Sequence, residues 1–358
     1  MTRTIRGAAA LAGLVLALHL PWLPSWLEDL DSFNFALGLR HFDVAQHQPH
    51  PPGYPVYIAV GRIIHAFVAN EARALAVVSL LAATAAAFIV YLLYRRWTST
   101  ADDGWVPTAG AVLAVTSPLF WITAVRPLSD MFGLALALAA QWLALTAASV
   151  SSLGLAAVVA GLGVGVRSQV VWLTVPLLAF VTLTWDRRSR LTAVVVSGAG
   201  FLVGALVWAV PLIVLSGGPA AYLNALASQG GEDFAGVAML ATHPTPRLLL
   251  SALDSTLLGA WGSTLLTPGA STSLTPGGST LLAPGASTAL TSGALFVIGV
   301  VVLMAAVAGL VRSWRVARRE LVLLLVAFLP YALFHLLFQE TVTTRSVTSG
   351  SNRLVSAK

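Results

Sequence analysis

The 358-residue sequence contains no cysteine, and only 9% of its residues are Asp, Glu, Lys or Arg. The missing cysteines exclude disulfide frameworks, cysteine-ligated zinc sites and thiol chemistry. A soluble domain carries about 25% charged residues because it must solvate its surface. The small charged fraction therefore excludes soluble enzymes and nucleic-acid-binding proteins, despite a pI near 10.3.

Apolar residues make up 57% of the chain, and its mean hydropathy is +0.84. A surface that faces hydrocarbon needs almost no charge, so the composition predicts an all-α polytopic membrane protein. Of the 20 basic residues only Lys358 is lysine. This bias, together with abundant Ala, Gly, Leu and Val, is typical of a GC-rich bacterial genome and predicts a multi-pass protein of the bacterial inner membrane. Membrane lipids are expected partners, and nucleic acid is not.

Nine apolar stretches are long enough to cross a membrane. A bilayer core of about 30 Å needs ~20 apolar residues in a helix, and ~17 are tolerated. The predicted spans are residues 7–24, 72–94, 106–124, 131–149, 154–166, 169–185, 191–216, 294–311 and 321–339. The stretch 54–70 is left out because Arg62 and His65 suit an interfacial helix on the outer side.

Arginine clusters set the expected orientation, because basic residues in short loops mark the cytoplasmic side. The clusters are Arg3 and Arg6, Arg95 and Arg96, Arg187, Arg188 and Arg190, and Arg312, Arg315, Arg318 and Arg319. All four fall on one side of a nine-span chain, so we expect a cytoplasmic N-terminus and an extracytoplasmic functional face. A cleaved signal peptide is the alternative for the first span, but the following "PWLPSWLEDLD" lacks a small-x-small cleavage pattern.

Residues 1–339 are expected to form one transmembrane domain with two long outer loops, 25–71 and 217–293, before a polar tail at 340–358. Loops of that length between spans are usually functional. The second loop contains two segments that predict amphipathic surface helices. It ends in four octapeptide repeats at 263–294, "STLLTPGA", "STSLTPGG", "STLLAPGA" and "STALTSGA". Their Pro-Gly pairs predict turns in an exposed linker, and a gate over an outer site is the alternative.

Carboxylates concentrate in the first outer loop, directly after the first span. The segment "EDLDSFNFALG" places Asp29 and Asp31 at the level of the lipid headgroups. A membrane enzyme that faces outward needs a base at this level, whereas a solvated acidic loop is the alternative interpretation. In "HQPHPP", His47 and His50 do not predict a metal site, because the intervening proline prevents a helix face and no third ligand is evident.

Further polar groups occur at the ends of apolar helices on the same side. Arg126 and Asp130 lie in "AVRPLSDMFG", and Arg167 follows a glycine-rich helix in "GLGVGVRSQ". Guanidinium groups at these positions either extend to the lipid headgroups or hold a phosphate with their planar set of donors.

The segments "DLDSFNFALGL" and "HQPHPPGYPVYI" resemble the GT-C superfamily of polytopic glycosyltransferases. The resemblance is to bacterial membrane proteins akin to protein O-mannosyltransferases, glycosyltransferase family 39. Those enzymes have a cytoplasmic N-terminus and a long first outer loop with an acidic motif and interfacial helices. The resemblance implies a GT-C-like helical bundle. It also implies inverting transfer of a sugar such as mannose from a polyprenyl-phosphate donor to a hydroxyl acceptor at the extracytoplasmic face.

The resemblance also implies roles for individual residues. Asp31 matches the family's acidic residue ahead of an aromatic–Ala pair, here Phe35 and Ala36, and is expected to be the catalytic base, with Asp29 as the alternate. Arg126 and Arg167 are expected to hold the lipid phosphate. The substrate-binding set is Arg126, Asp130, Arg167, His50 and Tyr54. No cofactor and no metal is expected, and the identity of the acceptor stays open.

Two other classes stay open. A transporter or lipid flippase would place charges or broken helices at the midplane and show a repeated half, which the sequence lacks. A catalytically inactive scaffold relative is suggested by the polar ending "SVTSGSNRLVSAK", where such proteins commonly continue into another span. Under the glycosyltransferase interpretation, Asp31, Arg126, Asp130 and Arg167 should line a single outward cavity beside the helix that contains Tyr54.

Overall fold

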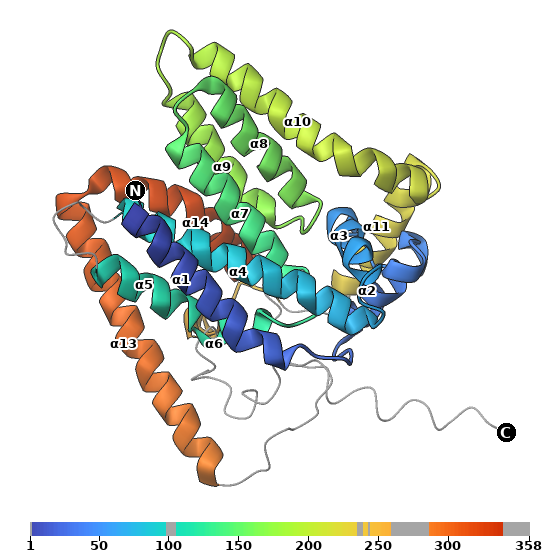
Figure 1. The fold of residues 1–358 in the computed structure, drawn as a ribbon, viewed down its shortest axis with the longest axis horizontal. Coiled ribbons are helices and arrows are strands. Elements are labelled where there is room, and N and C mark those ends of the chain that lie inside the picture. The colour runs from blue at the N-terminus through green and yellow to red at the C-terminus, as the bar shows by residue number, and fades with distance from the viewer. Residues whose placement is uncertain (1, 98–104, 235–238, 243, 259–285, 339–358) are drawn as a thin grey trace.

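The structure is a computed structural model, and it describes residues 2–97, 105–234, 239–242, 244–258 and 286–338. All regular elements in these ranges are helices (Figure 1). The longer helices are α1 (Thr2–His19), α4 (Glu71–Trp97), α7 (Asp130–Thr146), α8 (Val150–Val164), α9 (Val170–Leu183), α10 (Arg190–Leu215), α11 (Pro219–Phe234), α12 (Pro246–Leu258), α13 (Ala286–Val316) and α14 (Arg318–Phe338). The shorter ones are η1 (Leu20–Trp22), α2 (Leu30–Arg40), η2 (Val44–Gln46), α3 (Pro55–His65), α5 (Trp105–Val115) and α6 (Pro118–Thr123).

Five helices in the described part of the chain, α1, α4, α10, α13 and α14, are long and apolar enough to cross a membrane. The chain is therefore an all-helical, multi-pass membrane protein. The predicted count of nine spans is not confirmed, because α5, α7, α8 and α9 are apolar but shorter than the ~20 residues of an upright span. Helix α3, in the stretch left out of the count, has 11 residues and is also too short to cross.

The prediction of one continuous helix over 106–124 is wrong. Helix α5 ends at Val115, and α6 begins at Pro118 after an extended Ser117 with φ −58° and ψ 139°. Proline has no N–H to donate into a preceding turn, and its ring disfavours the helical conformation of the residue before it. Pro118 therefore explains the break between α5 and α6. The mostly apolar composition of residues 106–124 gives no sign of it.

The two helices predicted in the second outer loop are confirmed as α11 and α12. The prediction of turns is wrong for the last octapeptide, 287–294, which lies inside α13. This repeat has Ser292 where the other three have proline, so nothing in it stops a helix. Residues 263–285 of the earlier repeats and the tail 340–358 lie outside the described residues.

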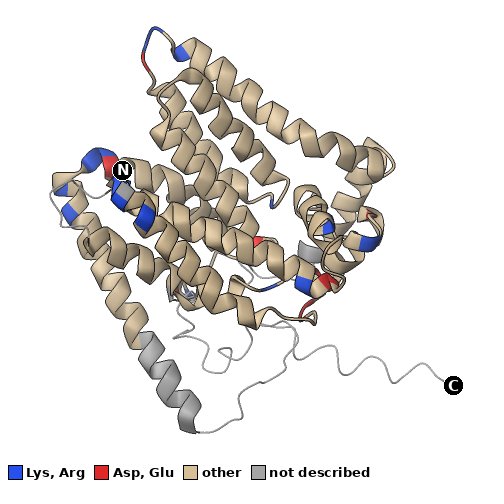
Figure 2. Cartoon of the chain, in the orientation of Figure 1, with Lys and Arg blue, Asp and Glu red and all other residues tan. Residues whose placement is uncertain are grey.

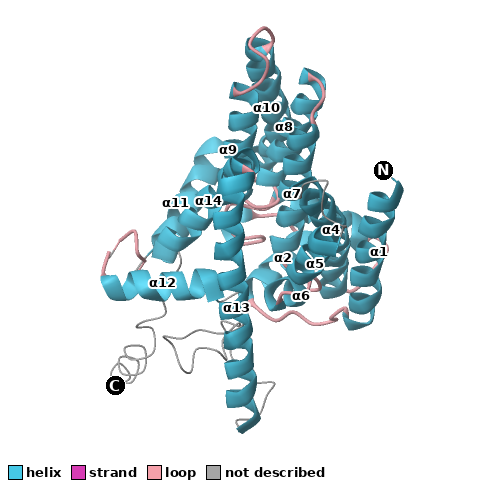
Figure 3. Cartoon of the chain, turned by 90° about the vertical axis from the view of Figure 1, so that its left-hand side faces the viewer, coloured by secondary structure: helices cyan, strands magenta, loops and turns pink. Residues whose placement is uncertain are grey.

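The helices α1, α4, α7, α8 and α10 lie side by side in that order, each in contact with the next (Figure 1). Helices α9 and α14 pack on each other, and α9 also contacts α7 and α8. Figure 3 shows α13 extending away from the other helices. Helices α2, α3 and α11 gather at one end of the bundle, beside the end of α4 that begins at Glu71 (Figure 1).

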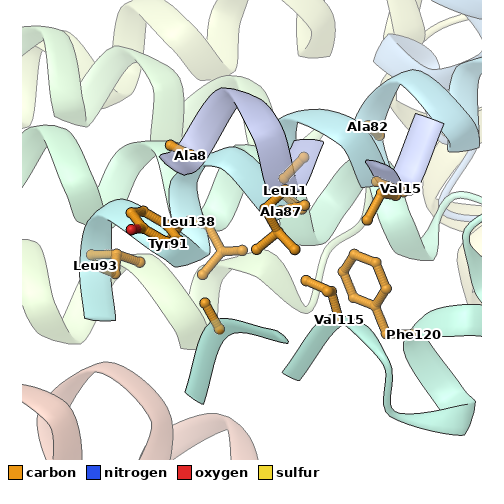
Figure 4. Close-up of a cluster of buried hydrophobic side chains, with 14 of the residues drawn as sticks. Ala8, Leu11, Val15, Ala82, Ala87, Tyr91, Leu93, Val115, Phe120 and Leu138 are labelled. Atoms are coloured by element: carbon orange, nitrogen blue, oxygen red, sulfur yellow. The ribbon is translucent and has the colours of Figure 1, made fainter. Parts of the chain in front are cut away.

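Small side chains allow α1 and α4 to approach closely. Ala8 of α1 and Ala87 of α4 are fully buried, and Tyr91 lies against Gly7, where a Cβ atom would overlap its ring. Figure 4 shows this cluster continuing into Val115 and Phe120. Helices in a membrane gain little from hydrophobic burial against one another, so such close van der Waals contact holds them together.

Glycine plays the same part between α8 and α10, and this contact can be tested. A Cβ atom at Gly204 would overlap the carbonyl oxygen of Val158 on α8. Because that obstacle is backbone, we expect Gly204→Ala to destabilise the protein by about 1–3 kcal/mol. Gly198, on the same helix, has open space around it, so Gly198→Ala should be neutral or slightly stabilising. Thermal unfolding in detergent measures both, and equal midpoints for the two variants would contradict the packing.

Figure 2 shows where the charges lie. Basic residues mark the N-terminal end of α1, the α9–α10 turn and the region where α13 meets α14, and acidic residues gather near the start of α2. Each predicted arginine cluster in the described residues therefore lies at a helix end away from α2 and α3.

Candidate functional site

Residues 25–71, predicted to be the first outer loop, form an ordered structure. Helix α2 begins with a capping box, in which the Asp29 carboxylate accepts from the Ser32 backbone N–H at 2.7 Å and the Asp29 N–H donates to Ser32 Oγ at 3.2 Å. Arg62 of α3 donates to the carbonyl oxygens of Leu39 and Gly38 at the end of α2, at 3.0 and 2.9 Å. Both ends of α2 are thus fixed, and the carboxylates near its start have defined positions.

Asp29 is occupied by structural contacts. Its Oδ1 accepts from Ser32, and its Oδ2 lies 2.7 Å from Arg126 Nη2. Only 10% of the Asp29 side chain is exposed. The Ser79 hydroxyl of α4 donates to the carbonyl oxygen of Arg126 at 2.6 Å and so holds the α6–α7 connection in place. Since both oxygens of Asp29 are engaged, its geometry suits a structural tie better than a base.

Asp31 lies in the first turn of α2, and 56% of its side chain is exposed. Its Oδ1 is 3.7 Å from His50 Nε2. The pKa of Asp31 is raised above its ordinary value of 3.8, mainly because the surrounding protein partly desolvates the carboxyl group and also because Asp29 and Asp130 are near, while His50 and Arg167 act in the opposite direction. Of the two carboxylates predicted as catalytic, Asp31 is the accessible one.

His50 and Tyr54 lie beside Asp31. His50 Nε2 is 3.1 Å from Tyr54 Oη, and both rings pack on Phe35 of α2. Tyr54 has a left-handed backbone, φ 45° and ψ 45°, directly before α3. A bulky residue in this conformation costs about 1–3 kcal/mol and often marks a functional site. The Val56 N–H donates to Gly165 O at 3.0 Å, which joins this turn to the loop that contains Arg167.

Arg167 and Asp130 form an ion pair, with Arg167 Nη1 3.0 Å from Asp130 Oδ1 and 3.4 Å from Ser129 Oγ. Gly133 of α7 lets the two segments meet, since a Cβ atom there would lie 3.3 Å from Arg167 Cβ. Arg167 and Asp130 line a cavity of about 460 Å³ between α4, α5, α7, α9 and α14. Most of its other lining residues are apolar.

The four residues expected in one cavity are divided by the structure. Asp130 and Arg167 line the large cavity, whereas Asp31 is not among its lining residues. Arg126 instead lines a second cavity of about 300 Å³, together with Glu28. Both guanidinium groups are paired with carboxylates inside the protein, which is not the arrangement of an arginine that extends alone to the headgroups.

The structure adds polar groups that the sequence analysis did not identify. Tyr331 of α14 lines the large cavity and interacts electrostatically with Arg167. His335, one turn later in α14, also interacts electrostatically with Arg167. Both lie in an apolar helix that the sequence analysis treated only as a span. Polar residues four positions apart on one face of such a helix were the available signal.

The structural role of Asp29 can be separated from catalysis. Asp29→Asn keeps a good N-cap but weakens the pair with Arg126, so we expect a loss of about 1–3 kcal/mol of stability. Asp29→Ala should lose about 1 kcal/mol more because the cap is also removed. Thermal unfolding of both variants checks that Asp29→Ala is less stable than Asp29→Asn. A fully stable Asp29→Ala protein would show that Asp29 is not structural.

Residues 43–192, less than half of the chain, match the family model of the protein O-mannosyl-transferase TMEM260 N-terminal domain. The matched stretch contains His50, Tyr54, Arg126, Asp130 and Arg167, and it begins after Asp31. Comparison with curated proteins and with solved structures found no match. Through this segment the chain is similar to a membrane glycosyltransferase, the protein O-mannosyl-transferase whose N-terminal domain the family model describes.

Proposed function

We propose that the protein transfers a sugar, mannose in the first instance, from a polyprenyl-phosphate donor to a hydroxyl acceptor. The observation that carries the proposal is the position of the exposed Asp31 carboxylate. It lies 3.7 Å from His50, and it is influenced electrostatically by the Arg167–Asp130 ion pair, which lines a large and mostly apolar cavity. A base, a cation for phosphate and apolar surface for a lipid chain are the three features that this reaction needs.

The large cavity suits the donor. An isoprenoid chain needs apolar walls, which α4, α7 and α14 supply. Its phosphate needs a cation, and Arg167 is the basic residue in the cavity lining. Arg167 contacts Asp130 and Ser129 through its Nη1 atom. Its planar set of donors therefore has capacity to bind phosphate oxygens.

These residues support the following reaction. Asp31 accepts the proton of the acceptor hydroxyl as the hydroxyl oxygen attacks the anomeric carbon of the sugar. The bond from that carbon to the phosphate oxygen breaks, and the lipid phosphate leaves with the electron pair. Arg167 stabilises the negative charge on the leaving phosphate. A single displacement inverts the anomeric configuration.

The proposed site faces the extracytoplasmic side of a bacterial inner membrane. The separation of the arginine clusters from α2 and α3 supports this orientation, because basic loops mark the cytoplasmic side.

The pH dependence of transfer tests the role of Asp31. Because the base must be ionised, the rate should fall as the pH drops through the raised pKa of Asp31, so the acid limb of kcat/KM lies above 3.8. His50 lowers this pKa, so His50→Gln should move the acid limb to higher pH. His41→Gln, at the other end of α2, is the matched control and should leave the limb in place. An acid limb that does not respond to His50→Gln would contradict the assignment.

A further inference from the structure

We propose that the second cavity binds a neutral hexopyranose unit of the acceptor. The cavity has a volume of about 300 Å³ and is lined by Trp22, Trp26 and Trp121 together with Glu28 and Arg126. The assignment to the acceptor rests on the proposed function, whereas the binding of sugar does not.

Two separate segments supply the aromatic walls. Trp22 and Trp26 belong to the connection between α1 and α2, and their side chains are 75% and 63% exposed. Trp121 belongs to α6, and its ring centroid lies 4.2 Å from that of His19. His19 is buried, with Nδ1 2.8 Å from the Val15 carbonyl oxygen and Nε2 3.2 Å from that of Trp121. One wall is therefore fixed, and the other consists of accessible indole rings.

The cavity also contains a polar pair with unused hydrogen-bonding capacity. Glu28 Oε2 lies 3.7 Å from Arg126 Nε, which is too far for a hydrogen bond. Arg126 Nε is buried and has no hydrogen-bond partner among the described residues. A hydroxyl group can accept from Arg126 and donate to Glu28 at the same time. Such a group gives both Glu28 and Arg126 an additional hydrogen-bond partner.

The charge balance favours a neutral ligand over a phosphate. Asp29 lies 2.7 Å from Arg126 Nη2 and Glu28 lies 3.7 Å from Arg126 Nε, so the charge of Arg126 is compensated. A phosphate headgroup would find no free positive charge here. A pyranose ring instead presents C–H groups to the indole faces and hydroxyl groups to Glu28 and Arg126. Apolar and aromatic walls with a few placed polar groups are typical of small-molecule sites, and about 300 Å³ is their lower size limit.

The position of the cavity suits an acceptor. Asp29 joins Arg126 to the start of α2, and Asp31 follows two residues later. A sugar held against Glu28 and Arg126 therefore contacts the segment that carries the proposed base. An acceptor with more than one sugar unit would be positioned by this contact.

Saturation-transfer NMR on the purified full-length protein in nanodiscs tests the proposal, with methyl α-D-mannopyranoside as probe and no donor present. We expect saturation transfer to the sugar in the wild type. Trp22→Ala/Trp26→Ala should weaken sugar binding about tenfold, as expected for the loss of two aromatic contacts. Trp105→Ala removes a tryptophan of similar exposure, 69%, at the start of α5 and should leave binding unchanged. Glu28→Gln should weaken binding several-fold.

Absence of saturation transfer in the wild type, or equal affinity in the double variant, would overturn the proposal. Stronger binding of glycerol 3-phosphate or phosphocholine than of the sugar would also overturn it and would make these tryptophans lipid-headgroup anchors. Equal unfolding midpoints of the double variant and Trp105→Ala exclude misfolding as the cause of weaker binding. Sugar binding in a protein that transfers no sugar would contradict the proposed function and leave the sugar site standing.

Discussion

Asp31→Asn is expected to lower the rate of sugar transfer by about 10²–10⁴-fold. The substitution keeps the shape of the side chain but removes its ability to accept a proton, and a positioned base contributes about that factor. Half of the Asp31 side chain is exposed, so the variant should insert, fold and bind donor lipid normally. Initial rates under saturating donor measure the loss in kcat.

Asp43→Asn is the matched control in the same loop. Asp43 caps η2 by accepting from the backbone N–H groups of Ala45 and Gln46 at 3.0 and 3.3 Å, and the amide oxygen of Asn can accept both. The transfer rate of the Asp43→Asn variant should stay near that of the wild type. If Asp31→Asn transfers sugar normally while Asp29→Asn is folded but does not, the base is Asp29. If neither substitution slows transfer, the proposed mechanism is wrong.

Arg167→Gln is expected to lower transfer by about 10²–10³-fold, the usual cost of removing one group that stabilises a developing negative charge. The variant also leaves Asp130 without its partner at 3.0 Å. An unpaired carboxylate at the cavity could impair the protein by itself. The single substitution therefore does not separate phosphate binding from ion pairing.

The double variant Arg167→Gln/Asp130→Asn separates the two roles. It removes both charges and leaves two neutral amide side chains that can form a hydrogen bond with each other. If Arg167 only neutralises Asp130, the double variant should recover most of the activity. We expect it to remain at least about 100-fold impaired, because no cation is left to hold the lipid phosphate. Transfer rates measured with the same donor distinguish the two results.

Local sequence features predicted much of the fold. Long apolar stretches predicted α4, α10 and α14 close to their observed bounds, and amphipathic patterns predicted α11 and α12. These features depend on neighbours within a few turns, which a sequence displays directly. The break at Pro118 was equally local, but the long apolar run around it concealed it. Helices α7, α8 and α9 were found as apolar segments, yet whether they cross a membrane depends on tilt and packing.

The candidate site depended on contacts that a sequence does not display. The sequence favoured Asp31 over Asp29 only through the resemblance to a family, whereas the ion pair between Asp29 and Arg126, 97 positions apart, gives a physical difference between them. The same contact gives Arg126 a structural role that the sequence could not distinguish from phosphate binding. Tyr331 meets the cavity of Arg167 only because α14 packs on α9. Residues could therefore be named as candidates from the sequence, whereas their grouping required the structure.

Transfer of labelled sugar by the purified protein tests the central claim most directly. Wild-type protein in proteoliposomes is supplied with radiolabelled mannosyl polyprenyl phosphate and with envelope material from cells that lack this protein as the source of acceptor. We predict that the label moves from the lipid to an acceptor hydroxyl with inversion, and that Asp31→Asn reduces this movement at least about 100-fold. Label that remains on the lipid with wild-type protein, or that moves equally fast with Asp31→Asn, would contradict the account.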